Sequence, residues 1–185
     1  MRRPGEAVVR SFLAAQASLR LTYEPEGISS GSLPHYTVDE IRVRIGTGRE
    51  CFERAKLALD RWDHFDLGWV FASCAAPAPL PGADVAVAVK HLGFWSLNGC
   101  RVLGRFPADD DDPRYGFYYG TLSSHAESGE ELFAVEIDPI DGSVWYQIRA
   151  VSRPRAWPAI AGYPYTRWLQ RRFRRDSVKA MTATA

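Results

Sequence analysis

The sequence has little cysteine, and its three cysteines, Cys51, Cys74 and Cys100, are odd in number and widely spaced. No C-x-x-C pair is present to suggest zinc or redox chemistry. A disulfide framework is therefore not expected, and free thiols are typical of a reducing compartment. The N-terminal stretch also lacks the apolar core of a signal peptide, because Glu6 and Arg10 interrupt it. Together these features predict a cytoplasmic protein.

An excess of charge of one sign is also missing, since 23 Lys and Arg balance 22 Asp and Glu. A protein without a net field has no general attraction for nucleic acid, so we expect no nucleic-acid partner. No apolar run approaches the ~20 residues that a membrane-spanning helix needs. The histidines lie on different predicted elements without metal-ligand spacing, so we expect neither a metal site nor a cofactor. They are His35, His64, His91 and His125.

The sequence does have enough apolar residues for a substantial core, with 46% hydrophobic residues in a chain of 185. This length and composition predict one domain over residues 1–185. Its N-terminal part, residues 1–35, is predicted as a helix followed by a loop rich in Gly, Ser and Pro. The apolar face of that helix would carry Val8, Phe12, Ala15 and Leu19. Residues 36–185 would form the body.

The body begins with a strand and a helix. Residues 36–45 alternate apolar with charged residues, as a strand with one covered face does. Thr47 and Glu50 have the spacing of a capping box, and apolar residues then recur at helical spacing. This predicts a helix over 48–63 with its aromatic stripe inward. The stripe consists of Phe52, Ala55, Leu59 and Trp62.

Strand periodicity follows through the segments 67–74, 84–91, 94–106, 115–122 and 131–138, with a polar loop predicted over 123–130. The clearest hairpin turns at Pro139–Gly142, whose residues favour a turn. A four-residue loop collects the apolar residues of both strands on one face. The predicted register places Ile137 opposite Val144, Val135 opposite Tyr146 and Phe133 opposite Ile148.

Helical periodicity returns from Pro164 to about Met181. One side of this helix is apolar, with Tyr165, Trp168, Leu169 and Phe173, and the other side is rich in Arg. The order of strand, helix, about six antiparallel strands and a long helix predicts an α+β fold. In that fold, a curved antiparallel sheet of about seven strands grips the C-terminal helix, and such a sheet often leaves a cavity beneath the helix.

Several runs of the sequence resemble a family of bacterial and plant proteins classified only as a domain of unknown function. They are residues 48–55 (GRECFERA), 97–102 (LNGCRV), 119–122 (YGTL), 129–136 (GEELFAVE) and 152–154 (SRP). That family resembles the START, polyketide-cyclase and birch-pollen-allergen superfamily of helix-grip folds. The resemblance implies the helix-grip fold and an internal cavity for hydrophobic ligands. It implies no particular activity, because that superfamily contains carriers, receptors and enzymes.

The leading functional hypothesis is a binding module that takes a small hydrophobic or aromatic molecule into the cavity between sheet and helix. Aromatic and aliphatic side chains on the predicted inward faces motivate it. We expect the cavity to be lined by Phe133, Val135, Tyr146, Ile148, Trp168 and Phe173.

The first alternative is an enzyme of cyclase, isomerase or hydrolase type that uses polar groups of the pocket for acid–base chemistry. The candidates are Asn98, Arg101, Tyr119, His125 and Glu131. Each also has a purely structural interpretation. Arg101 is more simply explained by an ion pair with Glu131 or Glu136, and His125 by a solvated loop.

The second alternative is an interaction surface on the C-terminal helix. Its basic residues could meet an anionic partner. The same helix has a simpler use, because its aromatic side can be the face that the sheet grips.

Overall fold

The computed structural model describes residues 2–24, 27–28, 31, 34–106, 112–155 and 162–185. Three α-helices, one short 3-10 helix and seven strands lie in this part of the chain. In chain order they are α1 (Glu6–Gln16), β1 (Thr37–Thr47), α2 (Arg49–Asp60), η2 (Asp63–Phe65), β2 (Val70–Cys74), β3 (Asp84–His91), β4 (Phe94–Phe106), β5 (Arg114–Thr121), β6 (Glu127–Ile137), β7 (Ser143–Pro154) and α4 (Tyr163–Thr184).

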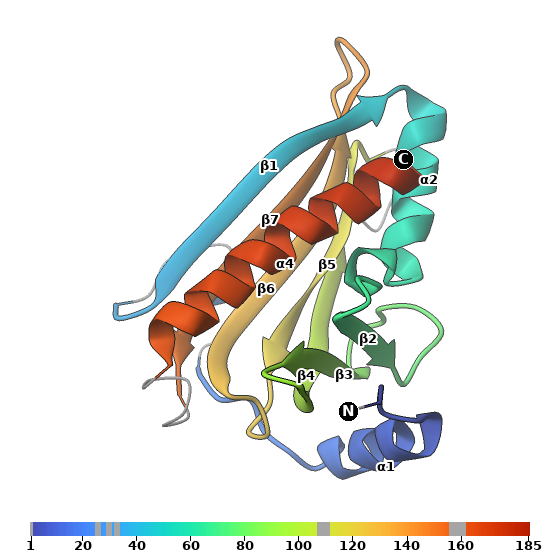
Figure 1. The fold of residues 1–185 in the computed structure, drawn as a ribbon. Coiled ribbons are helices and arrows are strands. Elements are labelled where there is room, and N and C mark those ends of the chain that lie inside the picture. Colours follow the sequence, from blue (N-terminus) through green and yellow to red (C-terminus); the bar gives the residue numbers. More distant parts are fainter. Residues whose placement is uncertain (1, 25–26, 29–30, 32–33, 107–111, 156–161) are drawn as a thin grey trace.

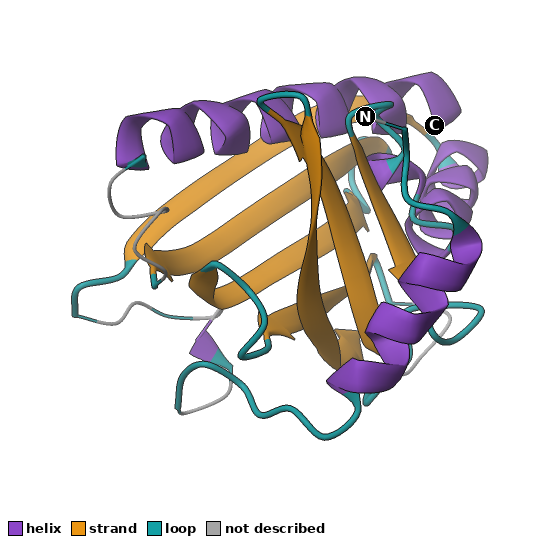
Figure 2. Cartoon of the chain, turned by 60° about the horizontal axis from the view of Figure 1, so that its bottom comes forward, coloured by secondary structure: helices purple, strands orange, loops and turns teal. Residues whose placement is uncertain are grey.

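The strands form one antiparallel sheet in the order β1-β7-β6-β5-β4-β3-β2. From β2 to β7, each strand pairs with the strand that follows it in the chain. Strand β1 extends the sheet by pairing with β7. The sheet curves beneath α4, and the long axis of this helix passes over several strands (Figures 1 and 2). The predicted fold class, a curved antiparallel sheet that grips a C-terminal helix, is confirmed.

The main core lies on the face of the sheet that α4 covers. Side chains of α2 and η2, among them Phe52, Leu59 and Phe65, pack there against the inward residues of β5, β6 and β7. The helix α4 joins this core through its C-terminal half, where Met181 and Ser177 are fully buried. The hydroxyls of Tyr146 and Ser177 are hydrogen-bonded at 2.8 Å. This end of the sheet is consequently filled, and the other end is where space remains.

Helix α1 covers the opposite face of the sheet, where Val9, Phe12 and Leu13 pack on Phe71 and Ala88. The apolar face predicted for this helix was wrong by about one position, because Val8 is 56% exposed while Val9 is buried. The helix also ends before Leu19, at Gln16. Its docked face follows the spacing of residues 9, 12, 13 and 16, which is equally compatible with the helical period.

The predicted register of the last hairpin is confirmed at all three pairs, Ile137 with Val144, Val135 with Tyr146 and Phe133 with Ile148. Two other predictions need correction. Strand β6 begins at Glu127 instead of 131, so half of the predicted polar loop is strand. No capping box starts α2, since its N-cap is Gly48 at φ 89° with no side-chain cap. The helix also ends at Asp60, before η2.

Candidate functional site

A cavity of about 420 Å³, partly open to solvent, lies between the N-terminal half of α4 and the sheet. Strands β2 to β7 supply its floor and walls, and its lining is mainly apolar. The volume falls within the range of small-molecule sites, which are mostly apolar with a few convergent polar groups. The apolar lining includes Phe65, Trp69, Val70, Val87, Val89, Leu169 and Phe173.

The course of β6 determines which polar groups enter the cavity. Residues 127, 129 and 131 share one face, because side chains alternate along a strand and this face continues into the core at Phe133. His125, in the turn just before β6, lines the same cavity. The face of β6 therefore presents Glu127 and Glu131 to the cavity. Gly129 lies between them, and a Cβ there would overlap the carbonyl oxygen of Val151 on the neighbouring strand. The close approach of β6 and β7 thus requires glycine at this position.

Glu131 is one of the carboxylates that line the cavity. Its Oε2 accepts a hydrogen bond of 2.7 Å from the hydroxyl of Tyr119 on β5. Burial raises the pKa of Glu131 to about 7, against the lowering effect of that hydrogen bond. Burial, and then the charge of Glu131, also raises the pKa of Tyr119 well above its ordinary value. The pair can therefore hold or release a proton on the carboxylate near neutral pH, while the phenol stays protonated.

Glu127 and His125 form the outer part of the same wall. Glu127 Oε1 accepts a hydrogen bond of 2.7 Å from Gln170 on α4, and burial raises its pKa. The backbone N–H of Glu127 donates to Nδ1 of His125 at 2.9 Å. Burial lowers the pKa of His125 to about 4. The imidazole is therefore neutral at pH 7, and its Nε2 carries the proton.

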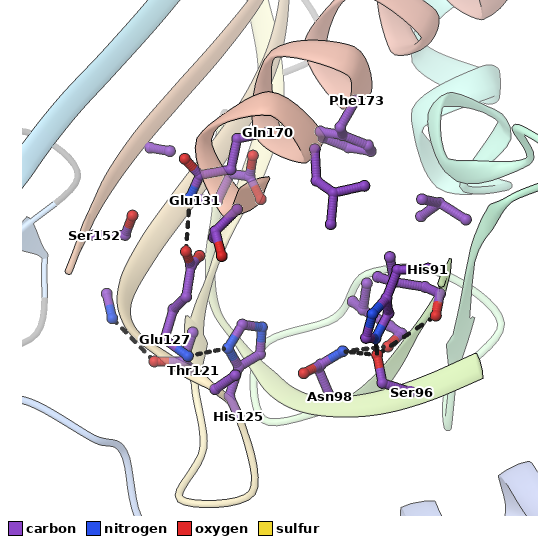
Figure 3. A pocket seen from close by; sticks show the side chains of 18 of the residues that line it. His91, Ser96, Asn98, Thr121, His125, Glu127, Glu131, Ser152, Gln170 and Phe173 are labelled. Carbon is purple, nitrogen blue, oxygen red and sulfur yellow. Dashed lines mark hydrogen bonds between the residues drawn. The ribbon is translucent and has the colours of Figure 1, made fainter. Parts of the chain in front are cut away.

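A second polar group faces these residues across the cavity, on β3 and β4. The side-chain amide of Asn98 donates to the Val87 carbonyl at 3.3 Å and to the Ser96 hydroxyl at 3.4 Å. The Ser96 hydroxyl also lies 3.2 Å from Nε2 of His91. Figure 3 shows Asn98, Ser96 and His91 on one side of the open space and Glu127, Glu131 and Gln170 on the other. A bound molecule can thus be held at two opposite ends.

An ion-pair network fastens α4 over the cavity at the β1 edge. Arg167 donates to both carboxylate oxygens of Asp39 on β1, with the Nη2–Oδ1 bond at 2.6 Å. Arg174 lies 3.4 Å from the same carboxylate. These partners lower the pKa of Asp39, the Arg167 hydrogen bond most of all. Further along the helix, Arg172 and Arg175 pair with Asp176. Much of the basic face of α4 therefore has acidic partners within this protein.

The structure brings five of the eleven candidate site residues together at the cavity. They come from strands β4, β5 and β6, from the turn before β6 and from α4: Asn98, Tyr119, His125, Glu131 and Phe173. The polar candidates among them were proposed for the enzyme alternative, yet they line the same space as the apolar ones. The binding and catalytic hypotheses therefore concern one site.

The other six candidates lie elsewhere. Four of them, Phe133, Val135, Tyr146 and Ile148, are fully buried in the packed core beneath α2 and the C-terminal half of α4. Trp168 is 47% exposed and stacks on Tyr165 outside the cavity. Arg101 faces the opposite side of the sheet. None of these six residues belongs to the lining of the cavity.

The position of Arg101 follows from the strand's alternation. Its Nε donates to Asp84 at 2.7 Å, and its guanidinium also donates to the carbonyl oxygens of Gln16 and Leu19 at the end of α1. The structural ion pair is present, but its partner is Asp84 instead of Glu131 or Glu136. Arg101 therefore holds α1 against the sheet and takes no part in the cavity.

Several lining residues were absent from the sequence prediction, above all Phe65, Trp69, Glu127 and Gln170. A signal existed for Glu127, since it has the same parity as His125 and Glu131. That signal requires knowing that β6 starts at Glu127. Gln170 likewise follows Thr166 and precedes Phe173 on one face of α4. Phe65 ends the short helix η2, which no periodic pattern indicated. Trp69 directly precedes β2, in a segment that was predicted as strand but not as part of the cavity.

Other kinds of site find no support among the described residues. Within those ranges, no group of three or more His, Cys, Asp and Glu side chains is placed to hold a metal ion. Cys51, Cys74 and Cys100 are free thiols. None of the described helices is both long and apolar enough to cross a membrane.

Comparisons with known proteins place this architecture in a family. The family model described as "Domain of unknown function (DUF1990)" matches residues 22–180. A UPF0548 protein of Dictyostelium discoideum is 37% identical over 155 residues, covering 80% of this chain and 72% of the relative. A UPF0548 protein of Deinococcus radiodurans is 36% identical over 183 residues, covering 92% of this chain and 86% of the relative.

A solved structure with the same fold is that of StfQ, a di-domain ARO/CYC protein from the steffimycin biosynthetic pathway. It aligns with a TM-score of 0.53 at 12% identity, covering 81% of this chain and 50% of the StfQ chain. At this identity the likeness concerns the fold alone.

Proposed function

Because the chain belongs to the DUF1990 family and has a mainly apolar cavity beneath α4, we propose that it binds a small hydrophobic or aromatic molecule there. The cavity itself is the observation that carries the proposal. Its apolar walls offer the hydrophobic contribution of roughly 25 cal/mol per Å² of apolar surface removed from water. The polar groups at its opposite ends would fix the orientation of the molecule.

The test is to fill the cavity from one wall. Val87 on β3 lines the cavity next to Asn98, its cross-strand partner on β4, so Val87→Phe places a ring in the space that the ligand would occupy. The probe is N-phenyl-1-naphthylamine, a small aromatic molecule whose fluorescence rises in apolar surroundings. We expect saturable binding to the wild-type protein and at least a tenfold weaker affinity for Val87→Phe.

The matched control is Val8→Phe, the same substitution at an exposed position on α1, on the other face of the sheet. It should leave the affinity for the probe unchanged. Thermal unfolding of all three proteins establishes that each is folded. Absence of saturable binding to the folded wild-type protein, or equal binding to folded Val87→Phe, would contradict the proposal.

A second candidate function, acid–base catalysis on the bound molecule, is favoured by Glu131. A carboxyl with a pKa of about 7 in an apolar cavity can both take and give a proton at neutral pH. Its partner Tyr119 fixes the orientation of the carboxylate. Glu131→Gln separates the two functions. The bound molecule is incubated with the wild-type protein or with the variant, recovered, and compared with the starting molecule. Conversion that disappears in the variant favours an enzyme, and unchanged recovery from the wild-type protein favours binding alone.

A further inference from the structure

The charged groups around Glu131 do not balance. The carboxylates of Asp39, Glu127 and Glu131 face the guanidinium groups of Arg167 and Arg174, so three acids meet two bases. Both guanidiniums are already directed at Asp39. Arg171 also acts on Asp39, but it is exposed on α4, where solvent screens it. One negative charge of the network therefore has no partner when all three carboxylates are ionised.

The unpartnered charge belongs to Glu131. Asp39 has its two arginines, and Glu127 has the Gln170 amide and the charge of Arg167. The charge of Arg174 also acts on Glu131, but its guanidinium is in contact with Asp39. The hydrogen-bond partner of Glu131 is the uncharged Tyr119, which bonds to Oε2 alone. No protein donor to its other oxygen lies within the described part of the chain. Buried carboxylates are normally paired with a cation. Among the described residues, Glu131 has no cation in direct contact, so a cationic group of a ligand could pair with it.

The other titratable groups around Glu131 do not supply that cation. His125, in the turn before β6, is neutral at pH 7 because burial lowers its pKa to about 4. The thiol of Cys100 on β4 and the phenols of Tyr119 and Tyr146 on β5 and β7 all have raised pKa values and stay uncharged. Glu130 and His91 also line the cavity, with their side chains hydrogen-bonded to Tyr23 and Ser96. The charge next to Glu131 is therefore set by the five residues of the network.

The surroundings of Glu131 suit an organic cation. The ring of Tyr119 lies 6.4 Å from that of Phe65, which in turn lies 4.8 Å from Phe173, and all three line the cavity. Aromatic faces attract cations, and the attraction strengthens when water is excluded. A carboxylate ligand would instead meet Glu127 and Glu131 with like charge, at an energetic cost.

We propose that the ligand of the cavity is an amphipathic amine, whose ammonium group pairs with Glu131 and whose hydrophobic body fills the space beneath α4. This inference rests on the proposed binding function and names the chemical class of the ligand. The ammonium donates to the oxygen of Glu131 that Tyr119 leaves open. The apolar body then contacts the aliphatic and aromatic walls of β2, β3 and α4.

Three probes with one hydrophobic body test the proposal. They are 1-naphthylmethylamine, 1-naphthalenemethanol and 1-naphthoic acid, which differ in the polar group alone. Isothermal titration calorimetry on the full chain at pH 8 gives the three affinities. We expect the amine to bind at least tenfold more tightly than the alcohol, and the acid to bind most weakly. An alcohol or acid that binds as tightly as the amine would overturn the amine proposal and leave the binding function intact.

The variant Glu131→Gln removes the charge and keeps an oxygen that can accept the Tyr119 hydrogen bond. In this variant the amine should lose its advantage over the alcohol, whose affinity should stay within about twofold. The matched control is Glu136→Gln on the same strand, whose carboxylate pairs with Arg42 outside the cavity. It should retain the wild-type preference. A preference for the amine that survives in Glu131→Gln would contradict the assigned ion pair.

The number of protons released on binding is an independent test of the proposed ion pair between the ammonium group and Glu131. Near pH 7 part of the Glu131 population is protonated, and an ammonium partner would displace that proton. Titrations in buffers of different ionisation enthalpy should show a fraction of a proton released per amine bound by the wild-type protein. The alcohol should release none, and neither should the amine with Glu131→Gln. If no probe binds the folded wild-type protein, both the amine proposal and the binding function fail.

Discussion

At the scale of single residues, His64 is the most unusual side chain of the core. It is fully buried on η2, among the rings of Trp62, Phe65, Phe117 and Phe133. Neither ring nitrogen has a hydrogen-bond partner in the described part of the chain. Burial consequently lowers its pKa to about 3. The imidazole must therefore stay neutral for the protein to remain folded.

This predicts a loss of stability in acid. The unfolded chain binds a proton on His64 below about pH 6.5, whereas the folded chain does so only near pH 3, so stability falls as the pH drops between these values. His64 alone should lower the free energy of unfolding by about 3 kcal/mol between neutral pH and about pH 4. Urea unfolding of wild type and His64→Phe across this range measures the difference.

The variant His64→Phe should show a correspondingly flatter acid limb, because phenylalanine binds no proton. The exposed His35 provides the control, and His35→Asn should keep the wild-type pH dependence. Identical acid limbs in wild type and His64→Phe would mean that His64 is not held neutral by burial.

The role of a residue was predictable from the sequence where the register between neighbouring strands could be worked out. Arg101 illustrates the limit. The hairpin of residues 84–91 and 94–106 was predicted, and its register sets Asp84 opposite Arg101. Without that register the sequence offered Glu131 and Glu136 as partners, on a more distant strand. The neutral state of His64 was not predictable, because it depends on rings brought together from β5, β6 and η2.

At the scale of elements, periodicity identified the strands and helices better than their ends. The terminal helix was predicted from Pro164 to about Met181, and α4 spans Tyr163–Thr184. The start of β6 was missed because Ser128, Gly129 and Glu130 favour loops by composition, whereas pairing with β7 makes them strand. That miss hid the alternation that brings Glu127 beside His125 and Glu131.

The turn between β6 and β7 tests the hairpin on which the main core is built. Gly142 adopts φ 68°, a left-handed conformation that a β-branched side chain resists. Its N–H donates to the Asp138 carbonyl at 2.9 Å and closes the turn. We expect Gly142→Val to lower the free energy of unfolding by about 1 to 2 kcal/mol, measured by urea titration.

Asparagine tolerates this conformation better than valine does, so Gly142→Asn should cost clearly less. A loss of stability that is the same for both variants would point to a cause other than backbone conformation. No loss for valine would mean that the turn does not need its left-handed residue.

At the scale of the whole molecule, the order of elements was enough to predict the sheet and its gripped helix. It was not enough to place the cavity. The boundary between filled core and open space depends on where large side chains from distant segments meet. Phe52 and Tyr146 fill the end near α2, together with Met181. Beneath the first half of α4, Val87, Gly129 and Ala150 leave room instead.

The most direct test of the account is native mass spectrometry of the protein purified from the organism that encodes it. Wild-type protein and Val87→Phe are expressed there in parallel. We predict that the wild-type chain carries one noncovalently bound small molecule, and that this molecule is depleted from Val87→Phe. Spectra in which both proteins show the bare chain, or both carry the same adduct to the same extent, would contradict a ligand in the cavity beneath α4.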